Sequence, residues 1–235
     1  MAPKLSADER RNSILMAAVP LFANNGFNGT TTREIAKAAG VSEALLYRHF
    51  PSKETLYAEL QGYCTAGKDQ AGENMELLEP STSTLVFLVH FVLKMIYEGI
   101  PGLHPSGLLH SDMNRMMINS FLEDGAFARF FLKGKADTWI QTFNRCFDAA
   151  DASGDMEEDW IHPSARMWFV HHLGVALALL HLPEEEVIDY GFGAEEMLPY
   201  ATRFCLRGMG MRTEAIKKYY NPSVLALFTE RLQKS

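Results

Sequence analysis

The sequence predicts an all-α fold in which a three-helix head at the N-terminus precedes a larger helical domain. Apolar residues recur with helical spacing along most of the chain, whereas alternating apolar and polar runs bounded by turns are scarce. Of the 235 residues, 47% are hydrophobic and 22% are charged, which is typical of a chain that buries a core. We place the head at residues 1–55 and the larger domain at residues 56–235.

The first predicted helix runs from about Ala7 to Asn24. Gly26 is suited to end it, because glycine readily adopts the backbone angles that terminate a helix. Pro20 cannot donate to the carbonyl of Met16, so we expect a local bend there. The inner side of this helix is formed by Ile14, Leu15, Ala18, Val19, Leu21 and Phe22.

Residues 31–50, TTREIAKAAGVSEALLYRHF, have the spacing of two short helices joined by a tight turn. Thr31 and Glu34 are placed to form a capping box, in which each side chain accepts from the backbone NH of the other residue. Gly40 suits the turn, and Ser42 is placed to cap the second helix. The expected inner residues are Ile35, Ala36, Ala39, Val41, Leu46 and Phe50.

The remaining face of the second short helix suits a DNA major groove. Its first residues are small or modest in size, and its last ones can reach phosphate oxygens. A corner of two helices with a solvated polar face is the alternative interpretation. The outward residues are Glu43, Ala44, Leu45, Tyr47, Arg48 and His49.

A long helix is expected from about Lys53 towards Leu78, ahead of Pro80 and the Ser/Thr cluster at 81–84. We expect the boundary between the two domains to lie along this helix. Segments 99–110 and 152–162 are expected to be loops or broken helix. Further helices are predicted near residues 83–98, 112–119, 121–151, 163–181, 194–208 and 222–233.

The formal net charge of −7 is distributed unevenly along the chain. Residues 1–60 carry 7 Lys+Arg against 6 Asp+Glu, a balance of +1, while residues 61–235 carry 15 against 23, a balance of −8. The acidity therefore belongs to the larger domain, and the head can approach phosphates. Charge permits DNA binding here without indicating it.

Membrane and secreted proteins are disfavoured. The longest apolar stretch, residues 168–182, contains three histidines and is shorter than the roughly 20 residues that span a bilayer. The first residues, MAPKLSADERR, lack the apolar run of a secretory signal, so a cytoplasmic location is expected. Cys64, Cys146 and Cys205 form neither a CxxC pair nor a disulfide framework.

Catalytic and metal-binding motifs are not found in the sequence. It contains no phosphate-binding glycine loop, no HExxH, no GxSxG and no Cys/His metal spacing. The acidic residues at 151–159 lack the order of an EF-hand. We therefore predict no enzyme, no cofactor and no metal site. A helical interaction module without DNA binding and, less favoured, an all-α enzyme are the alternative functions.

The segment from Arg11 to Leu56 resembles the tetracycline-repressor (TetR) family of regulators, and it covers about a fifth of the chain. The resemblance implies a DNA-binding head, a helical body that dimerises and, usually, a small-molecule site in that body. The matching residues are Ile14-Leu15-x-Ala17-Ala18-x-x-Leu21-Phe22, Gly26-Phe27, the Thr31 to Phe50 segment with Gly40-Val41-Ser42 and Leu46-Tyr47, and Ser52-Lys53-x-x-Leu56.

The resemblance also implies roles for single residues. Arg33 matches a position that reaches a base edge or a phosphate, and Arg48 fits either role. Glu43 either accepts from cytosine or points to solvent, and we slightly favour solvent. Ala44 and Leu45 match the base-facing start of the helix, while Tyr47, His49 and Lys53 match phosphate contacts. The expected DNA contacts are Thr32, Arg33, Glu43, Ala44, Leu45, Tyr47, Arg48, His49 and Lys53.

Segments 163–181 and 194–208 are expected to form the dimer interface. Segment 163–181 is apolar on most of its circumference, and the resembled family uses two C-terminal helices from each subunit. Leu177 and Leu206 are candidate contacts; the alternative is that both helices are internal core. A homodimer would set two recognition helices about 34 to 36 Å apart on double-stranded DNA, which predicts a near-palindromic operator.

Region 108–172 is rich in Met and aromatic residues. Such a composition is more often core than pocket, but it favours an apolar or aromatic effector that releases a repressor from its operator. His171 and His172 are neighbours on a helix and are poorly placed to share a metal. The candidate ligand-binding residues are Met113, Met117, Phe131, Trp139, Phe143, Trp168 and His172.

Overall fold

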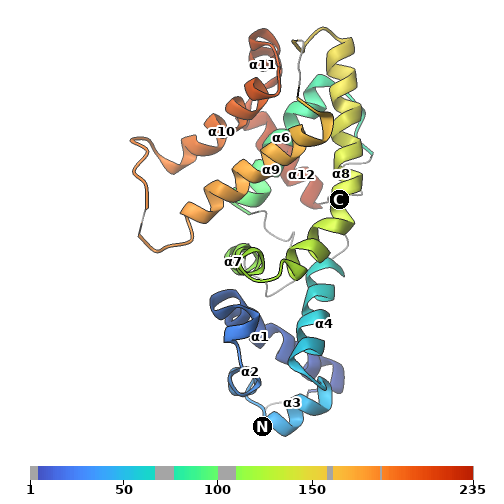
Figure 1. The fold of residues 1–235 in the computed structure, drawn as a ribbon. Helices are drawn as coiled ribbons and strands as arrows, with labels where there is room; N and C mark the ends of the chain where they lie inside the picture. The colour runs from blue at the N-terminus through green and yellow to red at the C-terminus, as the bar shows by residue number, and fades with distance from the viewer. Residues whose placement is uncertain (1–4, 67–76, 100–109, 158–160, 186, 235) are drawn as a thin grey trace. The chain divides into compact units, whose positions relative to one another are not determined.

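A computed structural model describes residues 5–66, 77–99, 110–157, 161–185 and 187–234. Across these ranges the regular structure is helical, which confirms the predicted fold class (Figure 1), and an isolated bridge joins Met156 to Met211. The helices are α1 (Ala7–Gly29), α2 (Thr32–Ala38), α3 (Glu43–His49), α4 (Lys53–Ala66), α6 (Thr82–Tyr97), α7 (His110–Leu122), α8 (Ala126–Ala152), α9 (Pro163–Leu180), α10 (Ala194–Gly208), α11 (Thr213–Tyr219) and α12 (Pro222–Lys234).

The helices gather into two compact units. The first unit contains α1 to α4, α7 and the start of α8, and the second contains the rest of α8 with α6 and α9 to α12. These units describe packing, so the predicted functional division at residues 55 and 56 stays a prediction. Most of segment 99–110, and residues 67–76 of the predicted long helix, lie outside the described residues, while residues 77 and 78 are described and form a turn and a bend.

Helix α1 is interrupted at Gly26, where φ is 70°. Its other internal residues, Pro20 included, have helical angles, so the break lies at the glycine and not at the proline. Helix α7 packs along α1, and Asn119 donates to the carbonyls of Phe22 (3.3 Å) and Ala23 (2.9 Å). These carbonyls belong to the last regular turn of α1, where a helix lacks internal partners.

The first unit has one hydrophobic core beneath the head. Leu46, Phe50 and Leu56 are completely buried in it, as is Ile14 of α1. Met113 and Met116 of α7 and Phe127 of α8 belong to the same cluster. The head therefore shares its core with α7 and the start of α8.

The second unit is built around α6, which is buried on most of its circumference. Leu85, Val89 and Leu93 are completely buried, and α9, α10 and α11 pack against this helix. Helix α11 was not predicted from the sequence. Seven residues are too few to form a stable helix alone, and packing of Ala215 and Ile216 holds it in place.

One histidine lies inside this second core. His90 is 3% exposed, and its Nδ1 lies 3.3 Å from Thr202 Oγ1. The Thr202 hydroxyl donates to the carbonyl of Leu198 (2.7 Å), so it accepts from Nδ1 of a neutral His90. Burial lowers the pKa of His90 to about 4, and the charge of Lys94 contributes in the same direction.

None of the helices described here has both the length and the apolar character needed to cross a membrane.

Candidate nucleic-acid interface

Helices α2 and α3 form the predicted helix-turn-helix. The Thr31 Oγ1 accepts from the Glu34 NH (3.3 Å), and the Glu34 carboxylate accepts from the Thr31 NH (2.8 Å). Hydrogen bonds from Thr31 also lower the pKa of Glu34. Gly40 turns the chain with a φ of 65°, and Ser42 Oγ accepts from the Leu45 NH (3.2 Å). The caps and the turn expected from the sequence are confirmed.

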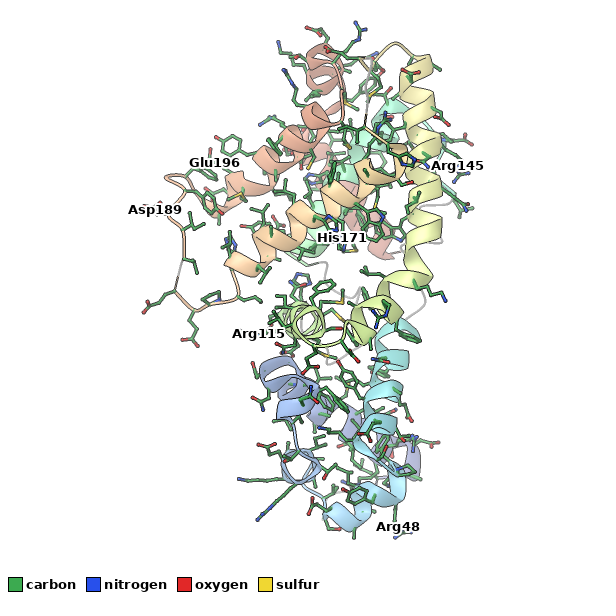
Figure 2. All side chains as sticks on the ribbon, in the orientation of Figure 1. Arg48, Arg115, Arg145, His171, Asp189 and Glu196 are labelled. Carbon is green, nitrogen blue, oxygen red and sulfur yellow. The ribbon has the colours of Figure 1, made fainter. Side chains whose placement is uncertain are left out.

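The two sides of α3 differ as expected. Leu46, inside the helix, and Phe50, directly after it, anchor the chain in the core. Arg48 projects away from the ribbon on the other side (Figure 2). Along the outward side, Glu43, Ala44, Tyr47 and Arg48 are exposed, and Leu45 and His49 are half-buried.

A small polar network joins α2 to α3. The Thr32 hydroxyl lies 3.3 Å from Glu43 Oε1 and 3.2 Å from the Tyr47 hydroxyl. Because Thr32 has one proton, it donates to the carboxylate and accepts from Tyr47. The Glu43 carboxylate is therefore exposed but held in place by the hydrogen bond from Thr32, a contact that could not be predicted from the sequence.

Arg11 fixes the C-terminal end of α3, a role that sequence reasoning missed. Its Nε donates to Glu59 Oε1 (2.6 Å), and its Nη1 donates to the carbonyl of His49. The guanidinium also lies 4.3 Å from the centre of the Phe50 ring. The hydrogen bond to Glu59 raises the pKa of Arg11, so the side chain is a permanent cation that ties α1 to α3 and α4.

The ammonium of Lys53 is also engaged within the head. It donates to the carbonyls of Phe27 (2.7 Å) and Thr30 (2.9 Å) and lies 4.2 Å from the centre of the Phe27 ring. These carbonyls follow the break in α1, so Lys53 joins the start of α4 to the end of α1. The contact of Lys53 with a phosphate stays a prediction. The ammonium has three protons and donates two of them to these carbonyls, so the third can be donated to a phosphate oxygen.

Lys53→Met is expected to lower the free energy of unfolding by about 1 to 3 kcal/mol, because two hydrogen bonds from a charged group are lost. Arg48→Met is expected to change stability by less than about 0.5 kcal/mol. It should instead reduce the slope of log K against log salt for DNA binding by about 1 for each subunit bound. Urea unfolding and salt titration of both variants check this. A Lys53→Met protein of unchanged stability would contradict the capping role.

The predicted ligand-binding residues fall into both compact units. Three of them, on α7 and the start of α8, pack in the first unit, and Met113 is buried there against the head. Trp139 and Phe143 are buried in the core of the second unit. Trp168 is half-buried and stacks on the exposed His172, with ring centres 5.9 Å apart. The first-unit residues are Met113, Met117 and Phe131.

Unpaired polar atoms lie inside the second unit, and sequence reasoning missed them too. Trp139 Nε1, Asn144 Oδ1 and His171 Nδ1 are buried without a hydrogen-bond partner among the described residues. Burial lowers the pKa of His171 to about 4, with a smaller contribution from His172, so the imidazole is neutral near pH 7. Buried polar groups are nearly always hydrogen-bonded, so a water or a ligand is expected to supply the partners of these atoms.

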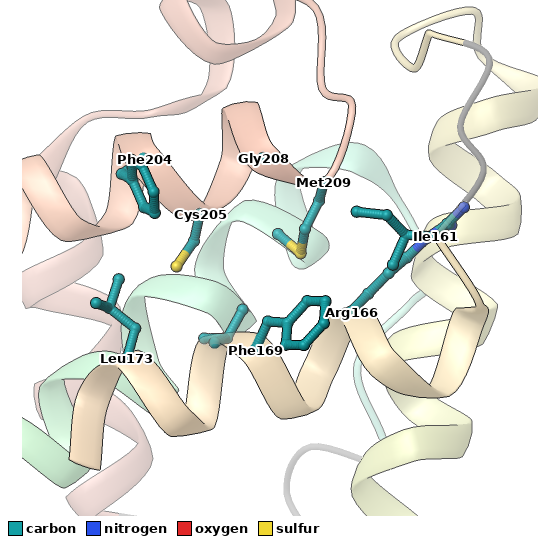
Figure 3. A pocket seen from close by; sticks show the side chains of 9 residues that line it. Ile161, Arg166, Phe169, Leu173, Phe204, Cys205, Gly208 and Met209 are labelled. Atoms are coloured by element: carbon teal, nitrogen blue, oxygen red, sulfur yellow. The ribbon is translucent and has the colours of Figure 1, made fainter. Parts of the chain in front are cut away.

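The outward side of α9 and α10 carries exposed aromatic residues. Phe169 is 58% exposed and Phe204 is 71% exposed. A pocket of about 200 Å³ opens between these helices beside both rings (Figure 3). Leu177 and Leu206, the candidate contacts from the sequence, are buried inside the chain. The sequence could not show this, because apolar periodicity does not distinguish an internal core from an interface.

Comparison with known proteins places the head in a known group of regulators. Residues 14–60 match the family described as bacterial regulatory proteins, tetR family. The HTH-type transcriptional repressor KstR2 of Rhodococcus jostii is 35% identical over 104 residues, which are 44% of this chain and 49% of that protein. The chain therefore aligns with about half the length of this relative.

Two further proteins match over more of the chain. KstR2 of Mycolicibacterium smegmatis is 26% identical over 165 residues, 69% of this chain and 78% of that protein. The structure of AibR in complex with isovaleryl coenzyme A and operator DNA has a TM-score of 0.58 and 18% identity. This match covers 87% of this chain and 100% of AibR, and it shows a shared fold.

Proposed function

Since residues 14–60 match the tetR family of bacterial regulatory proteins, we propose that this chain is a member of that family and a transcriptional regulator that binds a specific DNA operator. The observation that carries the proposal is the geometry of α3, which is anchored by Leu46 and Phe50 and presents an uncovered face of Ala44, Tyr47 and Arg48. Such a face fits a major groove. The protein acts in the cytoplasm and is not an enzyme.

The DNA contacts we propose come from both short helices. Arg33 and Arg48 are exposed cations near the groove-facing side, and either can contact guanine or a phosphate. Ala44 and Leu45 pack on thymine methyl groups. Arg11 is a positioning residue, because its bond to His49 fixes the end of α3. The full set is Thr32, Arg33, Glu43, Ala44, Leu45, Tyr47, Arg48, His49 and Lys53.

We propose that the regulator is a homodimer and acts as a repressor. One short recognition helix reads few base pairs, and a two-fold dimer doubles the site and makes the operator near-palindromic. The exposed aromatic residues on α9 and α10 support a partner on that side of the second unit. Similarity to the KstR2 repressors supports repression over activation.

A small, mainly apolar effector releases the repressor in this proposal. AibR, which shares the fold, has been crystallised with isovaleryl coenzyme A and operator DNA. In the second unit, Trp139 Nε1 offers a hydrogen-bond donor within the apolar core, and His171 Nδ1 offers a second polar atom beside the rings of Trp168 and His172. They suit a ligand with an apolar body and a polar group, such as an acyl or aromatic acid derivative.

Selection from a random duplex library with the full-length protein tests the function. The recovered sequences are expected to be near-palindromic, with half-sites about one helical turn apart, and binding should weaken steeply with salt. Recovery of one unsymmetrical half-site, or of no preferred sequence, would contradict the proposal.

The selected operator then serves to test the effector. Short acyl-coenzyme A thioesters and aromatic acids are added to the protein–DNA complex, and release is followed by fluorescence anisotropy. An effector is expected to lower operator affinity about 5- to 150-fold, which corresponds to a coupling of about 1 to 3 kcal/mol. Trp139→Phe should reduce the response to the effector and leave operator affinity unchanged. Failure of every compound to bind and release DNA would count against a ligand of this class.

A further inference from the structure

The polar network between α2 and α3 holds an exposed carboxylate on the side of the head proposed to meet DNA. This carboxylate belongs to Glu43, the first residue of α3 and the one acidic residue of that helix. Its Oε1 accepts from the Thr32 hydroxyl at 3.3 Å, and it has no other hydrogen-bond partner in the part of the chain that the structure describes. The second oxygen of the carboxylate is therefore open to a donor from outside the protein.

Tyr47 fixes the direction of this hydrogen bond. Its hydroxyl lies 3.2 Å from the Thr32 hydroxyl, whose single proton is donated to Glu43. Tyr47 is therefore the donor in its own contact with Thr32, and this contact keeps the Thr32 proton directed at the carboxylate. Because the Glu43 side chain is already held in place, its contact with DNA costs less conformational entropy than the same contact from a free side chain.

A carboxylate held at this surface selects among the bases by its chemistry. It accepts hydrogen bonds and donates none, so it repels phosphates and the acceptor atoms of bases. In the major groove, cytosine presents its N4 amino donor without an acceptor, whereas adenine presents its N6 amino group beside the acceptor N7. Guanine and thymine present acceptors there. Cytosine is thus the base that best matches a fixed carboxylate.

We propose that Glu43 reads a cytosine in each operator half-site, and that Thr32 and Tyr47 are positioning residues that hold its carboxylate for this contact. The inference rests on the proposed operator binding, to which it adds the identity of one base pair, C·G, and the residues that select it. The sequence alone slightly favoured a Glu43 side chain that points to solvent. The hydrogen bond from Thr32 reverses that preference, because it holds the carboxylate beside two residues proposed to meet DNA.

The selected operator allows this contact to be tested one base pair at a time. Each position is replaced by the other three base pairs in both half-sites, and the affinity of the full-length protein is measured by fluorescence anisotropy. At one position the wild-type protein is expected to prefer cytosine at least about tenfold over the other bases. Glu43→Gln is expected to shift the preference to adenine at that position alone, because an amide bonds to both N6 and N7 of adenine.

Separate variants test the two positioning residues. Thr32→Val keeps the shape of threonine without the hydroxyl, and Tyr47→Phe removes the donor to Thr32. Each is expected to reduce the preference for cytosine at least about threefold, because Glu43 is still present but is no longer held. Thr32→Ser keeps a hydroxyl and should keep the preference. Loss of a phosphate contact alone would weaken binding to all sequences alike, so the ratio of affinities separates positioning from phosphate binding.

Glu54→Gln is the matched control for the change of charge. Glu54 is exposed at the start of α4 and takes no part in the network that joins α2 to α3. Its neutralisation removes one negative charge from the head, as Glu43→Gln does, and any gain in affinity should be the same for all sequences. The preference for cytosine should therefore stay unchanged in this variant.

The outcomes separate the base contact from the proposed function. A wild-type protein that selects no operator would overturn the function and the base contact together. An operator at which Glu43→Gln changes no base preference would overturn the role of Glu43 and leave the regulator standing. A preference of the wild-type protein for another base at the position that Glu43 controls would overturn the assignment of cytosine. Unchanged preferences in Thr32→Val and Tyr47→Phe would overturn the positioning roles.

Discussion

Phe50→Ala is expected to lower the free energy of unfolding by about 3 to 5 kcal/mol and to abolish measurable operator binding. Phe50 is completely buried directly after α3, and its NH donates to the carbonyl of Leu46 (2.9 Å). The ring also carries the Arg11 guanidinium on its face. Loss of the ring leaves a cavity and removes one of the contacts that hold Arg11 at the end of α3. Urea unfolding followed by far-UV circular dichroism measures the effect.

Phe121→Ala is the matched control for this variant. Phe121 lies on α7 in the same compact unit, but it is 54% exposed, so its truncation should change stability by less than about 0.5 kcal/mol. Similar losses of unfolding free energy in the two variants would show that the buried Phe50 ring contributes no more to stability than the exposed Phe121 ring. Unchanged sedimentation of Phe50→Ala is also expected, because the proposed dimer contacts lie in the second unit.

The head could be predicted from the sequence because its determinants are local. The capping pair of Thr31 and Glu34 is three residues apart, and Gly40 and Ser42 act on their own turn and helix start. The contacts that position this motif could not be predicted. Arg11 reaches a carboxylate 48 residues away, and nothing in the periodicity of α1 indicates that pairing.

The second unit could be predicted only in outline. Apolar spacing shows that a helix is buried, but it does not show which element covers it. For Leu206 it leaves a dimer interface and an internal core as alternatives, and the residue lies inside the chain. The same limit applies to Met113, which packs against the head. Unpaired atoms such as His171 Nδ1 depend on three-dimensional packing and have no signature in the sequence.

The stability of the protein is expected to fall by about 3 kcal/mol between pH 7 and pH 4 through His90 alone. The unfolded chain binds a proton at this side chain near pH 6.5, whereas the folded protein binds it only at about pH 4. The unfolded state therefore takes up the proton first. The stabilising effect is fully present above pH 6.5 and is lost as the pH falls towards 4. Each pKa unit between the two states corresponds to about 1.4 kcal/mol.

His90→Asn isolates this effect from the titration of other groups. The Asn amide can donate to Thr202 Oγ1 as His90 Nδ1 does, but it does not titrate. Acidic residues and His171 titrate in both proteins, so their contributions cancel in the difference between the two unfolding curves. The wild-type protein should be the more stable of the two near pH 7, and this advantage should shrink or reverse by pH 4. Parallel curves across the whole range would show that His90 takes up its proton equally in the folded and unfolded states, contrary to its burial beneath Thr202 and Tyr220, whose ring centre lies 6.0 Å away.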